Sequence, residues 1–487
     1  MPAVALSDAL RDRAREDPER AAITDGRRTL SRARVDELVD LCALRLLEAE
    51  VGPGAVVALS ATNSAELLMA IFAVWRVGAV PLALHPRKQR DEMIDLVARS
   101  GAELAVGFPA GYRADWSGVR TCSLDDLFRP GASGPLPEVP VSPRLRIGSS
   151  GGSTGPAKLI AVDVPAIVNP ARPWHYGLRP GGTHVVPLDV CDGTGFVAST
   201  AALALGCHQV LMHRFDAETM LGLVERFRVD WTAMTQPSMV ATVKLPAQVR
   251  TGYDVSSLRC VTQYSGAVAE WVKRAWIEWL GPERIAESYG ASDARGSTWI
   301  DGAEWLARPG SVGRAAPGCE IAIFSAAGRR LPAGEPGLVY IRDLTGRRNF
   351  HYLQGAPESL DGGWENFGDS GRLDGDGYLY LLDRTKDIIG AAEGPVIPLP
   401  VEGALEFHHA VRSAVVIGLP GRDGVERVHA LIDAPGGVDV TDLECMLRER
   451  FPGVRVPDTW EQVDGPLRDN AGKASRRRLR DQRVPPA

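Results

Sequence analysis

A segment rich in glycine and hydroxyl side chains, in the first third of the chain, has the composition of a phosphate-binding loop. Residues 148–158 read GSSGGSTGPAK. Glycines let backbone N–H groups approach an anion closely, because no Cβ intervenes. The hydroxyls and Lys158 add further donors and one positive charge. These residue types in a single turn predict a site for the phosphates of a nucleotide.

The same loop does not match the Walker A pattern of P-loop NTPases. That pattern places the lysine directly after a glycine and directly before a serine or threonine. Here Ala157 precedes Lys158 and Leu159 follows it. The sequence therefore predicts a phosphate-binding loop of another kind.

Lysine is rare in this chain and arginine is common. Lysines occur at positions 88, 158, 244, 273, 386 and 473, while Lys and Arg together number 55. A lysine offers a compact, rotatable point charge that arginine cannot mimic. Lys158, Lys386 and Lys473 lie in glycine-rich or turn-rich segments, which makes them candidates for chemistry.

Four further segments contain residue types suited to a nucleotide. Residues 264–268 read YSGAV, whose small side chains let a flat base lie on the backbone. Residues 287–293 read ESYGASD and end on a carboxylate, a ligand type that Mg²⁺ prefers. Residues 368–371 read GDSG, where the aspartate can accept hydrogen bonds on two oxygens. Residues 466–476 read PLRDNAGKASR, and a positioned lysine there could stabilise charge that builds up during phosphoryl chemistry.

In this order along the chain, the motifs resemble those of the adenylate-forming superfamily, which includes acyl- and aryl-CoA synthetases, stand-alone adenylation domains and luciferases. The resemblance covers nearly the whole chain. It implies an AMP-forming ligase that uses ATP and Mg²⁺ to convert a small carboxylic acid, aromatic or amino-bearing among the options, into an acyl-adenylate and pyrophosphate. The acyl group would then pass to coenzyme A.

The resemblance also implies roles for individual residues. Lys473 would drive adenylate formation, with Asp293 as the Mg²⁺ ligand and Thr154 against the phosphates as the other members of the catalytic set. Family members usually carry glutamate where this chain has the shorter Asp293. Asp387 would be the hinge residue. The residues implied to bind the nucleotide are Ser150, Gly151, Ser153, Thr154, Gly155, Lys158, Gly266, Ala267, Tyr289, Gly290, Ser292, Asp369 and Arg384.

Two segments depart from the family pattern. Where family members often carry a Gly-Gly pair that admits the pantetheine arm of the acceptor, this chain has Ala392 and Glu393. Added side chains would narrow a tunnel built for close backbone approach, which leaves the thioester step open. In the acid-binding segment, residues 187–193 read PLDVCDG in place of an aromatic and a histidine. Its aspartates either read an amine on the substrate, since a buried carboxylate demands a partner, or lie solvated in a loop. The substrate contacts predicted are Asp189, Cys191, Asp192 and Ser265.

Three alternatives to transfer onto coenzyme A stay open at this point. The acyl group could pass to the thiol of a separate carrier protein or to an amine. The protein could activate an unusual nucleophile such as nitrite, for N–N bond formation. In a different class, it could be a non-catalytic nucleotide-binding regulator, although Lys473 speaks against this because a binder needs no transition-state cation.

Composition excludes several other classes. A net charge of −6 argues against a nucleic-acid partner, which would favour a basic surface. The 7 cysteines are scattered without metal-ligand spacing, which fits reduced thiols in a cytoplasm. The charged N-terminal segment lacks the apolar core of a signal peptide, and the apolar run over residues 67–84 is broken by arginine, glycine and proline. We therefore expect a cytoplasmic monomer or homodimer without a membrane partner.

The elements that must position these residues follow from hydrophobic periodicity. The pattern predicts a helix over residues 37–49, a strand over 55–59, a helix over 65–77 and a strand over 79–84. This alternation predicts a mostly parallel sheet with helices on its faces. The charged first residues, 1–22, have a helical pattern.

Further along, short strands predicted at residues 321–324, 337–341 and 378–382 are separated by Gly/Pro turns and indicate a β-rich subdomain. Residues 414–418 and 428–432 then read as strands. Together these features predict an α/β protein. A large N-terminal domain, residues 1–383, would contain layered α/β subdomains and the β-rich subdomain. A hinge at residues 384–387 would lead to a small, mobile α+β C-terminal lid, residues 388–487.

Overall fold

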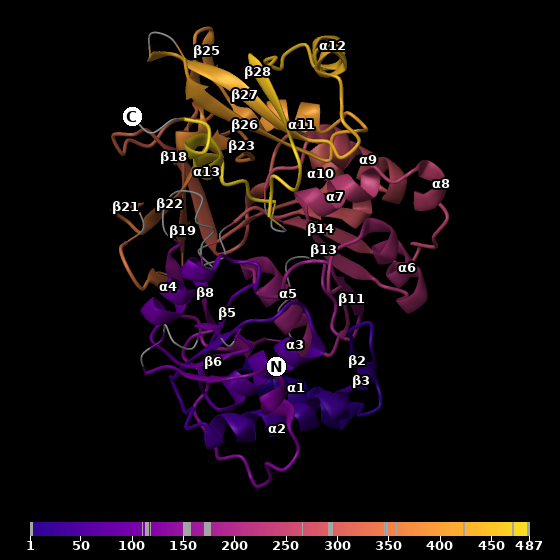
Figure 1. Ribbon diagram of the computed structural model, residues 1–487, viewed down its shortest axis with the longest axis vertical. Helices are drawn as coiled ribbons and strands as arrows, with labels where there is room; N and C mark the ends of the chain where they lie inside the picture. The colour runs from indigo at the N-terminus through magenta and orange to yellow at the C-terminus, as the bar shows by residue number, and fades with distance from the viewer. Residues whose placement is uncertain are drawn as a thin grey trace.

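The computed structural model describes residues 3–109, 111–112, 116, 118–149, 157–169, 177–264, 266–290, 296–344, 346, 349–356, 358–421, 424–469 and 472–484. The described chain forms four larger sheets and one small two-stranded sheet. In Figure 1 the sheet built from early strands (purple) lies toward one end of the long axis, and the sheet built from the last strands (yellow) lies at the other.

The first large sheet has seven strands in the order β20-β9-β8-β5-β4-β6-β7. The five neighbouring strands β8, β5, β4, β6 and β7 run parallel. Strand β8 also pairs antiparallel with β9, and the predicted phosphate loop connects these two strands. The strands are β4 (Val56–Leu59), β5 (Val80–Ala83), β6 (Ala102–Val106), β7 (Arg120–Cys122), β8 (Arg146–Ser149), β9 (Leu159–Val162) and β20 (Phe350–Tyr352).

The second sheet has nine strands in the order β17-β16-β15-β14-β13-β11-β12-β2-β3. It is parallel from β15 through β2 and antiparallel at both edges. The strands are β2 (Ala21–Thr24), β3 (Thr29–Ser31), β11 (Thr183–Val186), β12 (His208–Leu211), β13 (Trp231–Thr235), β14 (Cys260–Tyr264), β15 (Ile285–Glu287), β16 (Thr298–Asp301) and β17 (Arg314–Ala315).

Helices fill the space between these two sheets and cover their other faces. The helices are α1 (Leu6–Glu16), α2 (Arg32–Glu48), α3 (Ala65–Arg76), α4 (Arg90–Ser100), α5 (Gly193–Ala204), α6 (Ala217–Phe227), α7 (Gln236–Val243), α8 (Ala247–Arg250), α9 (Glu270–Leu280) and α10 (Gly302–Ala307), with 3₁₀ turns at Asp125–Phe128 and Pro282–Arg284. One core joins α1, α2, α3 and α5 to strands of both sheets, through residues such as Val57 of β4 and Leu211 of β12. Burial of that apolar surface stabilises the layered arrangement.

The third sheet is antiparallel and consists of β18 (Cys319–Phe324), β19 (Gly337–Asp343), β21 (Glu358–Leu360), β22 (Trp364–Leu373) and β23 (Leu379–Arg384). The small sheet pairs β1 (Val4–Ala5) with β10 (Ile167–Val168). A 3₁₀ turn, η4 (Thr385–Asp387), then leads to the last sheet.

The last sheet contains β24 (Ile389–Ala391), β25 (Gly394–Val396), β26 (Ser413–Pro420), β27 (Glu426–Asp433) and β28 (Thr459–Val463), with helices α11 (Pro398–Leu405), α12 (Val440–Arg450) and α13 (Arg476–Asp481). It has apolar cores of its own, formed by residues such as Leu405, Val416 and Leu443 on one face and Val415 and Leu431 on the other. The domain boundary at residues 384–387 stays a prediction.

The predicted α/β class is confirmed, with differences at element ends. The predicted helix over 37–49 begins earlier, at Arg32, because Ser31 caps it by accepting a hydrogen bond from the Arg34 amide at 3.3 Å. The helical pattern of the first residues stops at Glu16, since the following Asp17 precedes a proline and is disfavoured in helical conformation. Within the described ranges, no helix combines the length and apolarity that a membrane crossing requires.

Candidate active site

Most of the predicted site residues lie on loops that follow strands of the first two sheets. The loop after β11 carries the predicted residues Asp189 and Asp192, and the loop after β5 carries two residues that were not predicted, His85 and Lys88. The loops after β14 and β15 carry Gly266 and Tyr289. Carboxyl ends of parallel strands lie along one edge of a sheet, where ligands of open α/β sheets bind. The fold therefore gathers loops that are far apart in sequence.

Part of the predicted site lies outside the described residues. These are Ser150, Gly151, Ser153, Thr154 and Gly155 of the phosphate loop, together with Ser265, Ser292 and Asp293. Of that loop, the structure describes Ser149 at the end of β8 and Lys158 just before β9. In the described parts of the chain, no group of three or more His, Cys, Asp or Glu side chains could hold a metal ion.

Tyr289, Asp369 and Arg384, three of the predicted nucleotide residues, are brought together from the second and third sheets. The Tyr289 hydroxyl donates a hydrogen bond to Asp369 Oδ2 at 2.7 Å. Arg384 Nε lies 3.6 Å from the other carboxylate oxygen of Asp369. Burial, and then the charge of Asp369, raise the pKa of Tyr289 well above its ordinary value, so the phenol stays a donor. The cluster fixes an aromatic ring, a carboxylate and a guanidinium side by side.

A buried ion pair that the sequence did not predict supports the adenine-side loop. Lys273 of α9 pairs with Glu287 of β15, and their side chains are 2% and 7% exposed. Gln263 Nε2 donates to Glu287 Oε1 at 3.1 Å and to the Gly266 carbonyl oxygen at 3.0 Å. Gly266 has φ +82°, a left-handed conformation that favours glycine. The rarity of lysine marks Lys273 as unusual. Only the fold shows that Lys273, through Glu287 and Gln263, supports the loop that contains Gly266 and Ala267.

The acid-binding segment is folded into a tight turn at the start of α5. The Asp192 amide donates to the Asp189 carbonyl oxygen at 3.0 Å, and Asp192 occupies the N-cap position. A Cβ at Gly195 would come within 2.0 Å of that same carbonyl oxygen, so the turn requires a glycine there. Asn63 holds the segment from outside, accepting a hydrogen bond from the Val190 amide at 2.9 Å. The turn therefore brings the carboxylates of Asp189 and Asp192 near each other.

Lys473, in the C-terminal part of the chain, acts electrostatically on one of these carboxylates, that of Asp192. Burial and the negative charges of Asp189 and Asp469 raise the pKa of Asp192 to about 6, while the positive charges of Lys473 and Lys88 act in the opposite direction. Asp469 also accepts a hydrogen bond from the Lys473 amide at 2.8 Å. The predicted catalytic lysine therefore acts electrostatically on one carboxylate of the predicted acid pocket.

His85 and Lys88 are site residues that the sequence analysis missed. His85 Nε2 lies 3.6 Å from Asp189 Oδ1. Burial lowers the pKa of His85, Asp189 opposes that effect, and Arg87 and Lys88 add to it. Lys88 pairs with Glu92 at 2.7 Å. The rarity of lysine and the position directly after a strand were the signals that could have found Lys88.

Cys191 is a buried thiol rather than a reactive one. Its Sγ donates to the Ala61 carbonyl oxygen at 3.5 Å. Burial, followed by the charges of Asp192 and Asp189, raises the pKa of Cys191, which keeps the thiol protonated. Any contact of Cys191 with a substrate would therefore be one of shape.

The predicted hinge residue and the predicted tunnel residues lie in two turns next to β24. Asp387, at the end of η4, lies with Oδ2 3.2 Å from Arg476 Nη1. Ala392 and Glu393 form the turn between β24 and β25. The Glu393 side chain is 73% exposed and pairs with Arg455 at 3.1 Å, so its charge is directed to that arginine.

Comparisons with known proteins identify the family. A family model described as AMP-binding enzyme matches residues 10–345. The 4-coumarate–CoA ligase-like 9 of Oryza sativa subsp. japonica is 26% identical over 466 residues, covering 89% of this chain and 84% of that protein. The fatty acid–[acyl-carrier-protein] ligase ScoC of Streptomyces coeruleorubidus is 31% identical over 287 residues, covering 57% of this chain and 54% of that protein.

Among solved structures, that of the amide bond synthetase McbA from Marinactinospora thermotolerans matches with a TM-score of 0.78 at 25% identity, covering 98% of this chain and 99% of that one. The match over nearly the whole of both chains agrees with the resemblance found in the motifs. Both it and the family model confirm the family predicted from the sequence. The chain therefore belongs to the AMP-binding enzymes, the adenylate-forming superfamily.

Proposed function

We propose that this protein uses ATP and Mg²⁺ to adenylate a small carboxylic acid, releasing pyrophosphate, and then transfers the acyl group to coenzyme A. The observation that supports the proposal is that the positive charge of Lys473 acts on the carboxylate of Asp192, lowering its pKa against the larger effect of burial. This effect supports a role for a cation from the C-terminal part of the chain at the predicted acid pocket. Attack of a carboxylate on the α-phosphorus increases negative charge in the transition state, and a fixed cation there lowers the barrier.

The nucleotide contacts fit the residues present. Asp369 offers carboxylate oxygens to the two ribose hydroxyls, and Arg384 holds that carboxylate in place. The Tyr289 ring offers a face on which adenine can stack, beside a loop of small residues at Gly266 and Ala267. Asp293 would hold the Mg²⁺, which supplies charge neutralisation on the phosphates.

For the acid, we propose a substrate that also carries an amine. Asp189 lies close enough to Asp192 for its negative charge to raise the pKa of Asp192. A cationic nitrogen between two carboxylates would relieve their repulsion and replace the water that each loses on burial. The lowered pKa of His85 keeps its imidazole neutral near pH 7, so it does not supply that positive charge.

The names of relatives suggest more than one acceptor for the acyl group. One relative is a CoA ligase, one is an acyl-carrier-protein ligase, and one structural match is an amide bond synthetase. Coenzyme A is the first candidate, and a carrier-protein thiol or an amine is the second. We further propose that residues 388–487 act as a lid turning about Asp387, as in hinge motions between half-reactions.

The experiment is substrate-dependent pyrophosphate release across a panel of amine-bearing and amine-free acids, with nitrite included, each with and without coenzyme A. We expect pyrophosphate and AMP with amine-bearing acids, and faster turnover when coenzyme A is present. Formation of ADP and orthophosphate would contradict the proposal. ATP binding without pyrophosphate release for any acid would favour a nucleotide-binding regulator instead.

A further inference from the structure

We propose that the buried carboxylate of Glu402 and the two arginines bound to it, Arg468 and Arg476, position the loop that carries Lys473. The inference rests on the proposed function, in which Lys473 acts in adenylate formation. The two arginines lie on either side of Lys473 in the sequence. They converge on one anchor in the structure.

The anchor is geometrically specific. The Glu402 side chain, on α11, is 1% exposed. Arg476 Nη2 lies 2.8 Å and 2.9 Å from the two carboxylate oxygens of Glu402, and Arg468 Nη2 lies 2.5 Å from Oε2. Burial alone would raise the pKa of Glu402, but Arg476 and Arg468 outweigh burial and lower it, so the group remains an anion. Two guanidinium groups on one buried carboxylate make a rigid, directional junction.

The loop between the arginines is tied to this junction. Arg468 Nη1 donates to the Gly472 carbonyl oxygen at 3.1 Å, directly before Lys473. The Asp469 amide donates to the Lys473 carbonyl oxygen at 3.0 Å, and the Lys473 amide donates back to Asp469 Oδ1 at 2.8 Å. A change at the anchor would therefore be transmitted to the backbone of Lys473 itself.

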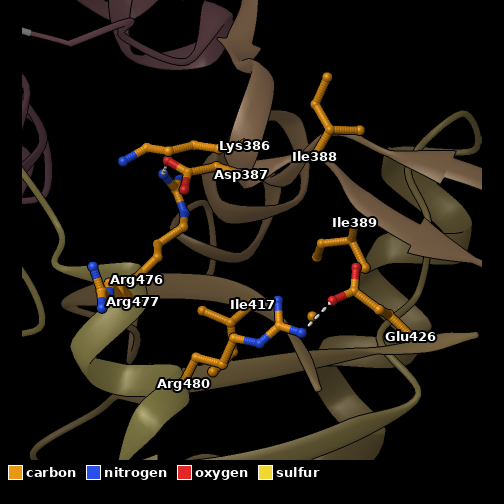
Figure 2. Close-up of a pocket in the computed structure, with 10 residues that line it drawn as sticks. Lys386, Asp387, Ile388, Ile389, Ile417, Glu426, Arg476, Arg477 and Arg480 are labelled. Atoms are coloured by element: carbon orange, nitrogen blue, oxygen red, sulfur yellow. Dashed lines mark hydrogen bonds and ion pairs between the residues drawn. The ribbon is translucent and has the colours of Figure 1, made fainter. Parts of the chain in front are cut away.

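The same junction reaches the predicted hinge. Arg476 Nη1 lies 3.2 Å from Asp387 Oδ2 and 3.8 Å from Asp383 Oδ1. Figure 2 shows the Arg476 guanidinium directed at Asp387, while Arg480, on the same helix, reaches Glu426 instead. This second arginine lies away from the Lys473 loop and provides a matched control.

Glu406 extends the junction toward the rest of the molecule. Arg468 Nε lies 3.6 Å from Glu406 Oε1, and Gln236 Nε2 of α7 donates to Glu406 Oε2 at 2.6 Å. Through this route the Lys473 loop is held relative to the helices of the second sheet as well as to its own sheet. The Lys473 loop is therefore held from both sides.

The test compares Arg476→Gln with Arg476→Lys and with the control Arg480→Gln, in the full-length protein. Acid-dependent ATP–pyrophosphate exchange gives kcat and the KM for ATP. We expect Arg476→Gln to lower kcat about 100-fold, the order expected when a reacting group is misplaced by about 1 Å. The KM for ATP should change less than threefold (~0.6 kcal/mol), because Tyr289, Asp369 and Arg384 are untouched. Arg476→Lys, which keeps the charge but not the fork, should recover part of kcat.

A merely structural role predicts another pattern. It would lower both thermal stability and kcat and would raise the KM for ATP, and the loss of activity would shrink at lower temperature. That pattern, or equal effects of Arg476→Gln and Arg480→Gln on kcat, would overturn the proposal.

Hydrogen exchange separates this inference from the proposed function. If the wild-type protein shows no acid-dependent ATP–pyrophosphate exchange with any acid, the adenylation proposal fails. The amides of Asp469, Gly472 and Lys473 can still be followed in the substrate-free protein. Faster amide hydrogen exchange of the peptide containing them in Arg476→Gln than in Arg480→Gln supports the proposal that Arg476 positions the Lys473 loop. Equal hydrogen exchange in the two variants overturns that proposal.

Discussion

On the nucleotide side of the site, Asp369 already has two partners, whereas the acid side holds carboxylates that lie close to one another. Asp369 accepts from the Tyr289 hydroxyl and lies beside Arg384, all within the first 384 residues. For Asp192, burial and then the negative charges of Asp189 and Asp469 raise the pKa, while Lys473 and Lys88 oppose them. The carboxylate of the nucleotide side is held by two partners, whereas the carboxylates of the acid side raise one another's cost of ionisation, which is the basis of the proposed amine recognition.

The difference also concerns which parts of the chain contribute. On the acid side, Lys473 from the C-terminal part of the chain acts on Asp192, while on the nucleotide side Tyr289 follows the second sheet and Asp369 lies in the third. Preorganised groups require no reorganisation when the ligand binds. Groups delivered by another segment depend on how that segment is held, and this dependence is what the following changes test.

The largest expected effect is that of Lys473→Ala. Removing the cation should lower the rate of adenylate formation about 10³-fold, the upper range for loss of one electrostatic stabiliser. The affinity for ATP should be unchanged, because Asp369 and Arg384 remain. Pyrophosphate release and equilibrium nucleotide binding measure the two quantities. Lys473→Arg is the control for charge alone, and an unchanged rate in Lys473→Ala would remove Lys473 from the mechanism.

Asp369→Ala should break the preorganised side instead. It removes the carboxylate that holds Tyr289 and Arg384, and it leaves a buried phenol without its acceptor. Loss of hydrogen bonds to a charged group, at about 1.5–3 kcal/mol, corresponds to roughly 10- to 150-fold weaker ATP binding. Calorimetric titration with ATP measures this effect. Asp361→Ala, at an exposed position, is the control, and equal affinities of the two variants would contradict the ribose assignment.

Local elements and short motifs could be predicted from the sequence, because the signals for them are local. The helix at Ala65–Arg76 follows from an apolar run capped by Ser64, which accepts from the Leu67 amide at 3.2 Å. The nucleotide motifs place Tyr289 and Asp369 in the same cluster that the structure shows. In both cases neighbouring residues carry the information.

Contacts between distant segments could not be predicted. Nothing near Tyr352 indicates that its strand pairs with β9 at Ile160. The approach of His85 to Asp189 depends on the relative placement of two different sheets. The anchor at Glu402 combines residues from α11 and from both ends of a later loop, and no single segment contains that pattern.

A smaller effect is expected from Asp189→Asn, which sharpens the account of the acid side. The amide keeps the shape but removes one of the two charges that an amine would meet. We expect roughly tenfold weaker kcat/KM for an amine-bearing acid, the loss of about 1.4 kcal/mol. An amine-free acid of similar size should be used with unchanged efficiency. Equal losses for both acids would reject amine recognition by Asp189.

The smallest expected effect is a pH-dependent gain in stability from Asp192→Asn. In the folded protein the pKa of Asp192 is raised from 3.8 to about 6, with burial as the largest cause. Between these values the native state binds the proton more tightly than the unfolded chain does, so this carboxylate lowers stability progressively as pH rises through that range.

The asparagine variant escapes that loss, because it stays neutral at every pH. Its melting temperature should match the wild type near pH 4 and exceed it at pH 7.5 by about 1 °C, the shift that a gain on the order of 1 kcal/mol gives for a chain of this length. Thermal unfolding at the two pH values measures the difference, with Asp91→Asn as the control, since that side chain is 97% exposed. A gain in melting temperature that does not depend on pH would show that ionisation of Asp192 does not destabilise the folded protein. The gain should also disappear when an amine-bearing substrate is bound to the wild type, because the ligand then supplies the missing positive charge.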